Sequence, residues 1–160
     1  MTLLRYHLAQ INIARMRAPL DDPLMAEFVA RLDIINALAE RSPGFVWRLQ
    51  TPEGDATALR VFDDALILVN MSVWESSEAL FNYVYRSDHG KSFRDRQKWF
   101  EKLDGRPNVA LWWVPAGEIP SVESAKQRLE YLKQYGPTEY AFNFKTRFPE
   151  PSRPYLALTE

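Results

Sequence analysis

The sequence lacks cysteine entirely and has only two histidines among its 160 residues. Without cysteine, disulfide scaffolds, thiolate metal sites, iron–sulfur clusters and cysteine nucleophiles are all excluded. The sequence also has no large excess of either charge: 20 Lys and Arg are balanced by 21 Asp and Glu, which gives a formal net charge of −1. Nucleic-acid binding needs clustered excess positive charge. The composition therefore argues against nucleic acid as a partner.

Long hydrophobic runs are absent as well. The apolar N-terminal stretch is interrupted by Arg5, His7, Gln10, Asn12 and Arg15. A signal peptide needs an unbroken apolar region of about 7–15 residues and a small-residue cleavage site, and a membrane span needs about 20 apolar residues. We therefore expect no membrane partner and a cytoplasmic location.

Several cofactor and catalytic motifs are missing. No GxGxxG, P-loop, HExxH or GxSxG pattern occurs in the chain, which argues against Rossmann cofactors, P-loop nucleotides and the corresponding hydrolases and metalloproteases. The acidic segment 51–64 lacks the ligand spacing and glycine placement of a calcium loop. The sequence predicts no metal site and no dedicated cofactor.

What the sequence does contain is 21 aromatic residues and a regular succession of apolar segments. Alternating or continuous apolar patterns predict strands at 4–16, 45–50, 66–74 and 109–115, with a further short strand near 59–62. Capping signals and apolar residues three or four apart predict helices that begin at Asp22-Pro23, Ser76 and Ser121 and end at 42–44, near Gly90 and at Gly136, with a second helical piece at about 91–103. In the last helix, Ala125, Leu129 and Leu132 share one face.

The order of these segments is β-α-β-β-α-β followed by an additional helix. This is the ferredoxin-like arrangement of the α+β class, an antiparallel sheet with helices on one face. We expect a single domain over residues 1–160, with its core at about 4–135 and a tail at 136–160.

The strands 66–74 and 109–115 are apolar on both faces, whereas a half-solvated sheet should alternate. Two helices cover only one face, so a second covering is needed. A second copy of the chain would supply it, and the sequence predicts a homodimer on this ground. The alternative is that the third helix and the tail fold over the free face.

Three stretches carry a family resemblance: WESSEALFNYVYRSDHGKSFRDRQKWF at 74–100, LWWVPAGEIPSVESAKQRL at 111–129 and YGPTEYAFNF at 135–144. They resemble a bacterial family known as a domain of unknown function, within the dimeric α/β-barrel superfamily of antibiotic-biosynthesis-monooxygenase-like proteins. The resemblance covers nearly the whole chain. It implies the ferredoxin-like fold and a homodimer, and allows activities from cofactor-free oxygenation to haem degradation.

Haem-degrading members of that superfamily use an asparagine on the first strand, a tryptophan that ends the third and a histidine on the second helix. Asn12, Trp74 and His89 stand in comparable places here. The interval from Trp74 to His89 is longer than in that pattern, which weighs against haem ligation.

Polar residues within the apolar strands are the first candidate site residues. Gln10, Asn12 and Asn70 interrupt such strands, and a buried amide needs a partner or a polar cavity. Gln10 and Asn12 share one strand face, and if that face meets the helices they would orient a substrate oxygen. On a face that meets a partner copy they would be interface hydrogen-bonding groups. His89, with an imidazole suited to acid–base chemistry near neutral pH, is predicted with Asn12 as a catalytic residue; its alternative role is to cap a helix end.

Aromatic and basic residues complete the predicted site. Trp74, Tyr83 and Trp112 are expected to line a pocket for a planar ligand, although core or dimer packing is the alternative for each. Arg86 and Arg96 lie in a segment with excess positive charge and are expected to contact an anionic group, unless that segment is a solvated helix face.

These observations lead to three hypotheses. The first is a monooxygenase-like enzyme that acts on a small planar or aromatic organic molecule without a dedicated cofactor. The second is a non-catalytic ligand-binding or stress-related dimer, and the third is a haem-binding or haem-degrading protein.

Overall fold

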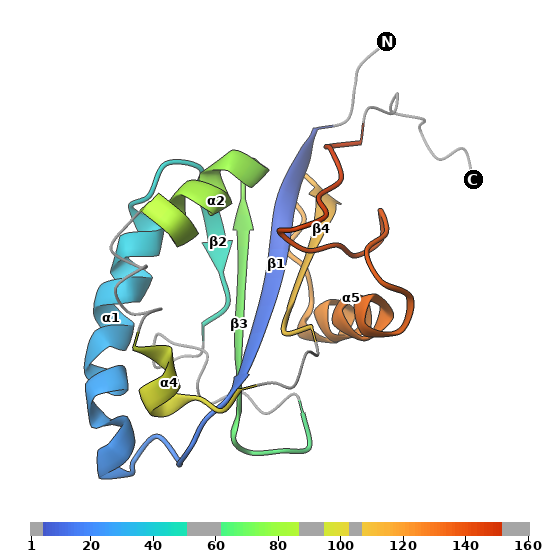
Figure 1. Ribbon diagram of the computed structural model, residues 1–160. Helices are drawn as coiled ribbons and strands as arrows, with labels where there is room; N and C mark the ends of the chain where they lie inside the picture. Colours follow the sequence, from blue (N-terminus) through green and yellow to red (C-terminus); the bar gives the residue numbers. More distant parts are fainter. Residues whose placement is uncertain (1–4, 51–61, 87–94, 103–106, 152–160) are drawn as a thin grey trace.

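The computed structural model describes residues 5–50, 62–86, 95–102 and 107–151 (Figure 1). The described residues form a sheet with the order β2-β3-β1-β4, in which every neighbouring pair is antiparallel. The strands are β1 (Tyr6–Arg15), β2 (Phe45–Arg48), β3 (Ile67–Trp74) and β4 (Val109–Pro115). This strand order, with helices between β1 and β2 and between β3 and β4, confirms the ferredoxin-like α+β fold.

The helices begin and end close to the signals in the sequence. They are the 3-10 turn η1 (Pro23–Met25), α1 (Ala26–Glu40), α2 (Ser77–Arg86), the short α4 (Arg96–Trp99) and α5 (Val122–Tyr135). The side chains of Asp22, Ser76 and Ser121 each accept a hydrogen bond from a backbone N–H of the following turn. Gly136 follows α5 with a φ of 75°, a conformation that favours glycine.

Two sequence predictions concern positions that the structure does not describe. The expected short strand near 59–62 falls almost wholly outside the described residues, as does the helix break at Gly90. Of the expected helical piece at 91–103, the described part contains the four residues of α4.

Helices cover the sheet from two sides. In Figure 1, α1 and α2 lie on one side of the sheet and α5 lies on the other. On the side of α1 and α2, here called the α1/α2 face, Leu8 and Trp74 stand opposite each other in the β1–β3 register. Both are fully buried and pack with Ala39 of α1 and Leu80 of α2. Burial on this side therefore holds the two connecting helices to the sheet.

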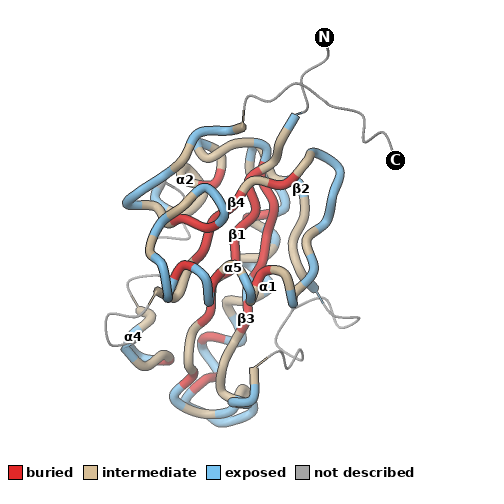
Figure 2. The backbone as a smooth tube through the Cα atoms, turned by 90° about the vertical axis from the view of Figure 1, so that its right-hand side faces the viewer, coloured by how far each residue is buried: buried red, intermediate tan, exposed pale blue. Residues whose placement is uncertain are grey.

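The opposite side, here called the α5 face, forms a second core. Ala125, Leu129 and Leu132 of α5 are buried against strand residues that include Ile11 and Trp112. These three helix positions are the ones that the spacing predicts as the apolar face. Figure 2 shows buried stretches concentrated in the strands.

The position of α5 bears on the homodimer prediction. The additional helix packs over β4 and β1, so the chain itself covers part of the face that a second copy was expected to cover. Near β2, Trp47 and Leu49 are only partly buried on the same side. The two-sided apolar strands alone therefore do not require a second copy.

The segment after α5 returns to the edge of the sheet. Phe142 is fully buried, and its backbone N–H and carbonyl pair with those of Leu111 in β4 at 2.9 and 2.8 Å. Its ring packs on the α1/α2 face near Phe148. The segment thus pairs with β4 at this edge and contributes to the core.

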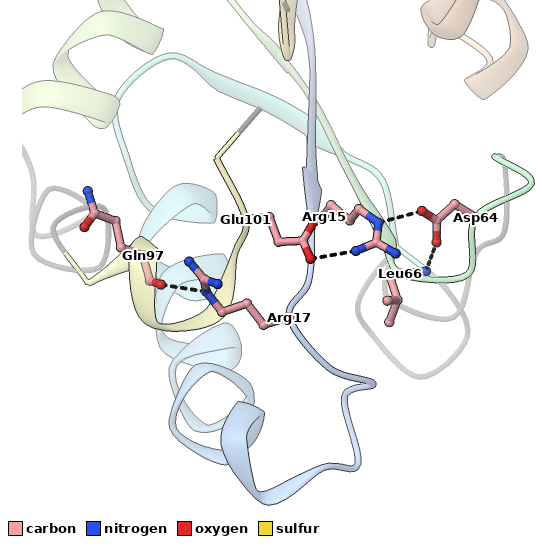
Figure 3. Close-up of polar contacts among 6 residues, drawn as sticks. All are labelled: Arg15, Arg17, Asp64, Leu66, Gln97 and Glu101. Atoms are coloured by element: carbon pink, nitrogen blue, oxygen red, sulfur yellow. Dashed lines mark hydrogen bonds and ion pairs between the residues drawn. The ribbon is translucent and has the colours of Figure 1, made fainter. Parts of the chain in front are cut away.

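A cluster of charged side chains links three segments at the end of β1 (Figure 3). Arg15 donates to Asp64, before β3, at 2.7 Å and to Glu101, after α4, at 2.8 Å. The next basic residue, Arg17, donates to the Gln97 carbonyl at 2.8 Å. These contacts hold the residue before β3 and the residues in and after α4 close to the end of β1.

Asp64→Asn is expected to lower the thermal midpoint slightly at neutral pH, since the ion pair with Arg15 is exposed. The Leu66 backbone N–H and the Arg15 guanidinium hold the pKa of Asp64 below its ordinary value of 3.8. Stability from this group is therefore present above the ordinary pKa and is lost as pH falls through the lowered value. Thermal melts between pH 7 and pH 2 should show the difference from wild type shrinking with acid.

Asp63→Asn is the matched control. Asp63 is exposed in the same turn and makes no hydrogen bond or ion pair with the described residues. It should leave the melting curve nearly unchanged at every pH. An Asp64→Asn curve that runs parallel to wild type at all pH values would show that the charge of Asp64 contributes no stability.

Candidate functional site

A row of polar side chains crosses the α1/α2 face where β1 and β3 pair. The register places Gln10 opposite Ser72 and Asn12 opposite Asn70. Gln10 Nε2 donates to Asn70 Oδ1 at 2.7 Å and to Ser72 Oγ at 2.8 Å. Opposed residues share a sheet face, so the four side chains lie on one surface, here called the polar row.

Next to the polar row lie three aromatic side chains, here called the aromatic wall: Trp74, Tyr83 and Phe45. Trp74 Nε1 donates to Ser72 Oγ at 2.8 Å. The indole stacks on Tyr83 of α2, with ring centroids 5.0 Å apart, and meets Phe45 of β2 edge-on at 5.6 Å. Every second residue of β3, from Asn70 through Ser72 to Trp74, therefore contributes to one surface.

The two ends of the row differ in exposure. Trp74 is fully buried, Ser72 and Gln10 are 7% and 8% exposed, and Asn70 is exposed to solvent. Asn12 is half-buried beside Asn70, and its amide makes no hydrogen bond with any described residue. Solvent thus reaches the row at Asn12 and Asn70, while its other end is closed.

The Tyr83 side chain is an uncharged part of the aromatic wall. Its hydroxyl donates to the Ile35 carbonyl of α1 at 3.3 Å. Burial raises the pKa of Tyr83, and the positive charge of Arg48 offsets this only in part. The phenol stays protonated at physiological pH, so it is unsuited to act as a general base.

Arg48 places a positive charge at the same face. It stands opposite Ser72 in the β2–β3 register and is 12% exposed, and its Nε donates to Glu40 of α1 at 2.8 Å. A guanidinium keeps its charge at any physiological pH. It is the described cation that the register brings beside the polar row.

The structure brings together five of the sequence-predicted site residues. Gln10, Asn12, Asn70, Trp74 and Tyr83 all contribute to the α1/α2 face. The sequence left open whether Gln10 and Asn12 would face helices or a partner copy. In this structure their strand face meets α1 and α2.

Trp112 lies elsewhere. The register pairs it with Ala9, which places it on the α5 face. There the Arg128 guanidinium lies 5.8 Å from its ring centroid. Consecutive strand residues point to opposite faces, and it is Trp113 that shares a face with Leu8. The structure therefore separates Trp112 from the polar row.

The structure does not describe His89 or the side chain of Arg86, and it places Arg96 in α4. His89 lies outside the described residues, so its predicted catalytic role and any haem ligation remain predictions. Arg86 ends α2, and its side chain is outside the described set. Arg96 begins α4, which packs against α1 through Trp99 and Phe28 with centroids 5.6 Å apart.

Ser72 and Arg48 are the site residues that sequence reasoning missed. Period-two alternation from Asn70 would have pointed to Ser72, because the two residues share a strand face. Arg48 needed the β2–β3 register, which shifts between Phe45 and Trp47. Across the described ranges, no group of three or more His, Asp or Glu side chains is placed to hold a metal ion. In the same ranges no helix is long and apolar enough to cross a bilayer.

Comparison with known proteins identifies a family but not a reaction. A family model described as a domain of unknown function (DUF3291) matches residues 7–157, which confirms the family resemblance seen in the sequence. No curated protein matches the chain significantly.

Solved structures of similar architecture include SnoaB, a cofactor-independent oxygenase from Streptomyces nogalater, at 19% identity and a TM-score of 0.48, covering 72% of this chain and 98% of that one. Two proteins from Nitrosomonas europaea are also similar. NE2512, of unknown function, has 12% identity and a TM-score of 0.47, with 72% and 96% covered. A "putative antibiotic biosynthesis monooxygenase" has 13% identity and a TM-score of 0.46, with 76% and 99% covered. Likeness at this level does not identify a substrate.

Proposed function

The chain belongs to the DUF3291 family, and since that family is described as a domain of unknown function, we propose a function from its own residues. The α1/α2 face binds a small planar organic molecule and positions it for oxidation, as in a monooxygenase-like enzyme without a dedicated cofactor. The molecule enters where Asn12 and Asn70 meet solvent and lies along the row toward the aromatic wall.

The polar row is the observation that supports this proposal. Burying an amide or hydroxyl among apolar side chains costs about 1–3 kcal/mol when its hydrogen bonds are incomplete. Gln10 and Ser72 are nearly buried in a face that is otherwise lined by large apolar residues. An apolar, aromatic surface with a few convergent polar groups is the usual character of a small-molecule site.

The chemistry of the row favours orientation and charge stabilisation. Its amide and hydroxyl groups are neutral, and neutral donors stabilise negative charge that develops on a substrate oxygen. Without a redox cofactor, the electrons that reduce O₂ come from the substrate itself. One oxygen atom replaces two hydrogens of a substrate methylene group as a carbonyl oxygen, and the other leaves as water. His89 is proposed as the base that removes the first proton.

Two further parts of the proposal concern the protein as a whole. We place it in the cytoplasm as a homodimer, with the second copy contacting the α5 face near Trp47 and Leu49, which are only partly buried in one chain. Light scattering at micromolar concentration tests this part, and a strictly monomeric mass would contradict it.

Asn12→Ala is expected to reduce turnover by about 100-fold, the usual effect of removing one donor to a developing oxyanion. The Asn12 amide makes no hydrogen bond with the described residues, so the melting temperature should hardly change. Oxygen uptake with a panel of planar ketones and phenols first identifies a substrate and then compares the variants.

Asn143→Ala is the matched control. Asn143 accepts a hydrogen bond from the Thr146 backbone in the C-terminal segment and should leave turnover unchanged. A substrate that is bound but never consumes oxygen would favour the non-catalytic binding function. Full turnover in Asn12→Ala would remove Asn12 from the mechanism.

A further inference from the structure

The hydrogen bonds of Ser72 leave one hydrogen without an acceptor. Its Oγ accepts from Gln10 Nε2 and from Trp74 Nε1, both at 2.8 Å. A hydroxyl oxygen has two lone pairs and carries one hydrogen, so both lone pairs are occupied. No described residue accepts that hydrogen. The residue is only 7% exposed.

We propose that the Ser72 hydroxyl donates this hydrogen to an oxygen atom of the bound molecule. The proposal rests on the function proposed above and narrows the ligand to planar molecules that carry an acceptor oxygen, as a ring ketone or a deprotonated ring hydroxyl. Ser72 is then a specificity-determining residue, and Gln10 and Trp74 are positioning residues that fix the direction of its hydroxyl.

The other donors of the row support this assignment by elimination. Both hydrogens of Gln10 Nε2 are used, one on Asn70 Oδ1 and one on Ser72. The single N–H of Trp74 is used on Ser72. Among the buried donors of the polar row, Ser72 is the one that still has a hydrogen to give. Leaving that hydrogen unpaired costs free energy, and a ligand oxygen removes the cost.

The position of Ser72 fits a ligand that enters from solvent. It lies two residues along β3 from the exposed Asn70, which corresponds to about 7 Å. In the proposed binding mode, a ring system that enters at the Asn70 end would point its leading oxygen at the hydroxyl, with the Trp74–Tyr83 stack beyond it.

Arg48 adds a preference for charge on that oxygen. The register places it directly opposite Ser72, and opposed residues have Cβ atoms about 4.5–5.5 Å apart. A nearly buried guanidinium favours nearby negative charge, although its pairing with Glu40 reduces the effect. The positive charge of Arg48 therefore favours an acceptor oxygen that gains negative charge, as in an enolate or phenolate.

The test compares two molecules of the same ring framework, 1-indanone, which has a carbonyl oxygen, and indane, which has none. Their binding is followed by the indole N–H signal of Trp74 in ¹H–¹⁵N NMR spectra, assigned with Trp74→Phe. Wild type should bind 1-indanone more tightly than indane by roughly fivefold to tenfold, the effect of one buried hydrogen bond. Ser72→Ala should remove this difference, and Ser72→Thr, which keeps the hydroxyl, should retain most of it.

Ser124→Ala is the matched serine control, since Ser124 hydrogen-bonds within the first turn of α5, and it should preserve the wild-type preference. An unchanged preference in Ser72→Ala would overturn the inference while leaving the ligand site in place. Binding of neither molecule, up to its solubility, would overturn both the inference and the proposed ligand site. Should Ser72→Ala fail to fold, a Ser72→Thr protein without the preference would overturn the inference equally.

Discussion

Trp74→Ala is expected to lower the free energy of unfolding by about 3–5 kcal/mol, the range for truncating a large aromatic side chain in a packed core. Trp74 is fully buried and connects the aromatic wall to the polar row through its hydrogen bond to Ser72. Its loss removes the stack on Tyr83, the edge contact with Phe45 and the hydrogen bond to Ser72. Urea unfolding followed by circular dichroism measures the change.

Trp74→Phe separates packing from hydrogen bonding. The smaller ring retains an aromatic contact with Tyr83 but has no N–H to donate, so the loss should fall to roughly 1–2 kcal/mol. Equal losses in the two variants would show that the indole N–H, and not the ring, dominates. A loss below about 1 kcal/mol in Trp74→Ala would contradict the packing described for this face.

Leu129→Ala has the second large expected effect, a loss of about 2–5 kcal/mol. Leu129 is fully buried between α5 and the sheet. If α5 covers this face within one chain, the loss should be the same at low and high protein concentration. If the face is buried mainly by a second copy, unfolding is coupled to dissociation and the midpoint rises with concentration.

Glu130→Ala is the control for this helix. Glu130 is exposed on α5 next to Leu129, and surface changes of this kind usually alter stability by no more than about 0.5 kcal/mol. A Leu129→Ala loss no larger than that of Glu130→Ala would show that α5 is not packed on the sheet in solution.

Local patterns in the sequence were sufficient for much of the fold. The three- and four-residue spacing of Ala125, Leu129 and Leu132 predicted the buried face of α5, and Ser121 and Gly136 marked its ends. The sequence left open whether this helix or a second copy would cover the free face of the sheet, because spacing within one helix carries no information about long-range contacts. The observed α5 covers part of the apolar surface that a second copy was expected to cover.

Boundary effects account for a smaller difference. The start predicted for the first helix, at Asp22-Pro23, includes Leu24 among its apolar residues, but Leu24 is 50% exposed. It lies in the 3-10 turn η1, before α1 begins, and a 3-10 turn has three residues per turn instead of 3.6. The α-helical spacing therefore does not apply at this position.

Local sequence patterns also predicted only part of the candidate site. Gln10 and Asn70 stood out because they are polar residues in apolar strands, and they are hydrogen-bonded to each other. Alternation showed that Trp112 and Trp113 must point to opposite faces, but only the pairing with β1 decides which face each takes. Register depends on contacts between distant segments, so the placement of Trp112 and the approach of Arg48 to the row could not be read from local sequence.

The Leu111–Phe142 bridge has a consequence for how the protein meets other chains. An open strand edge presents unpaired backbone groups that invite another strand, and natural sheets block such edges. Here the outer edge of β4 is already occupied at Leu111. The opposite edge strand, β2, has four residues and an irregular register, and short or bulged strands are poor templates for pairing. In the part of the sheet that the structure describes, both edges are therefore poor templates for an intermolecular ribbon, which favours association between copies through the faces and helices.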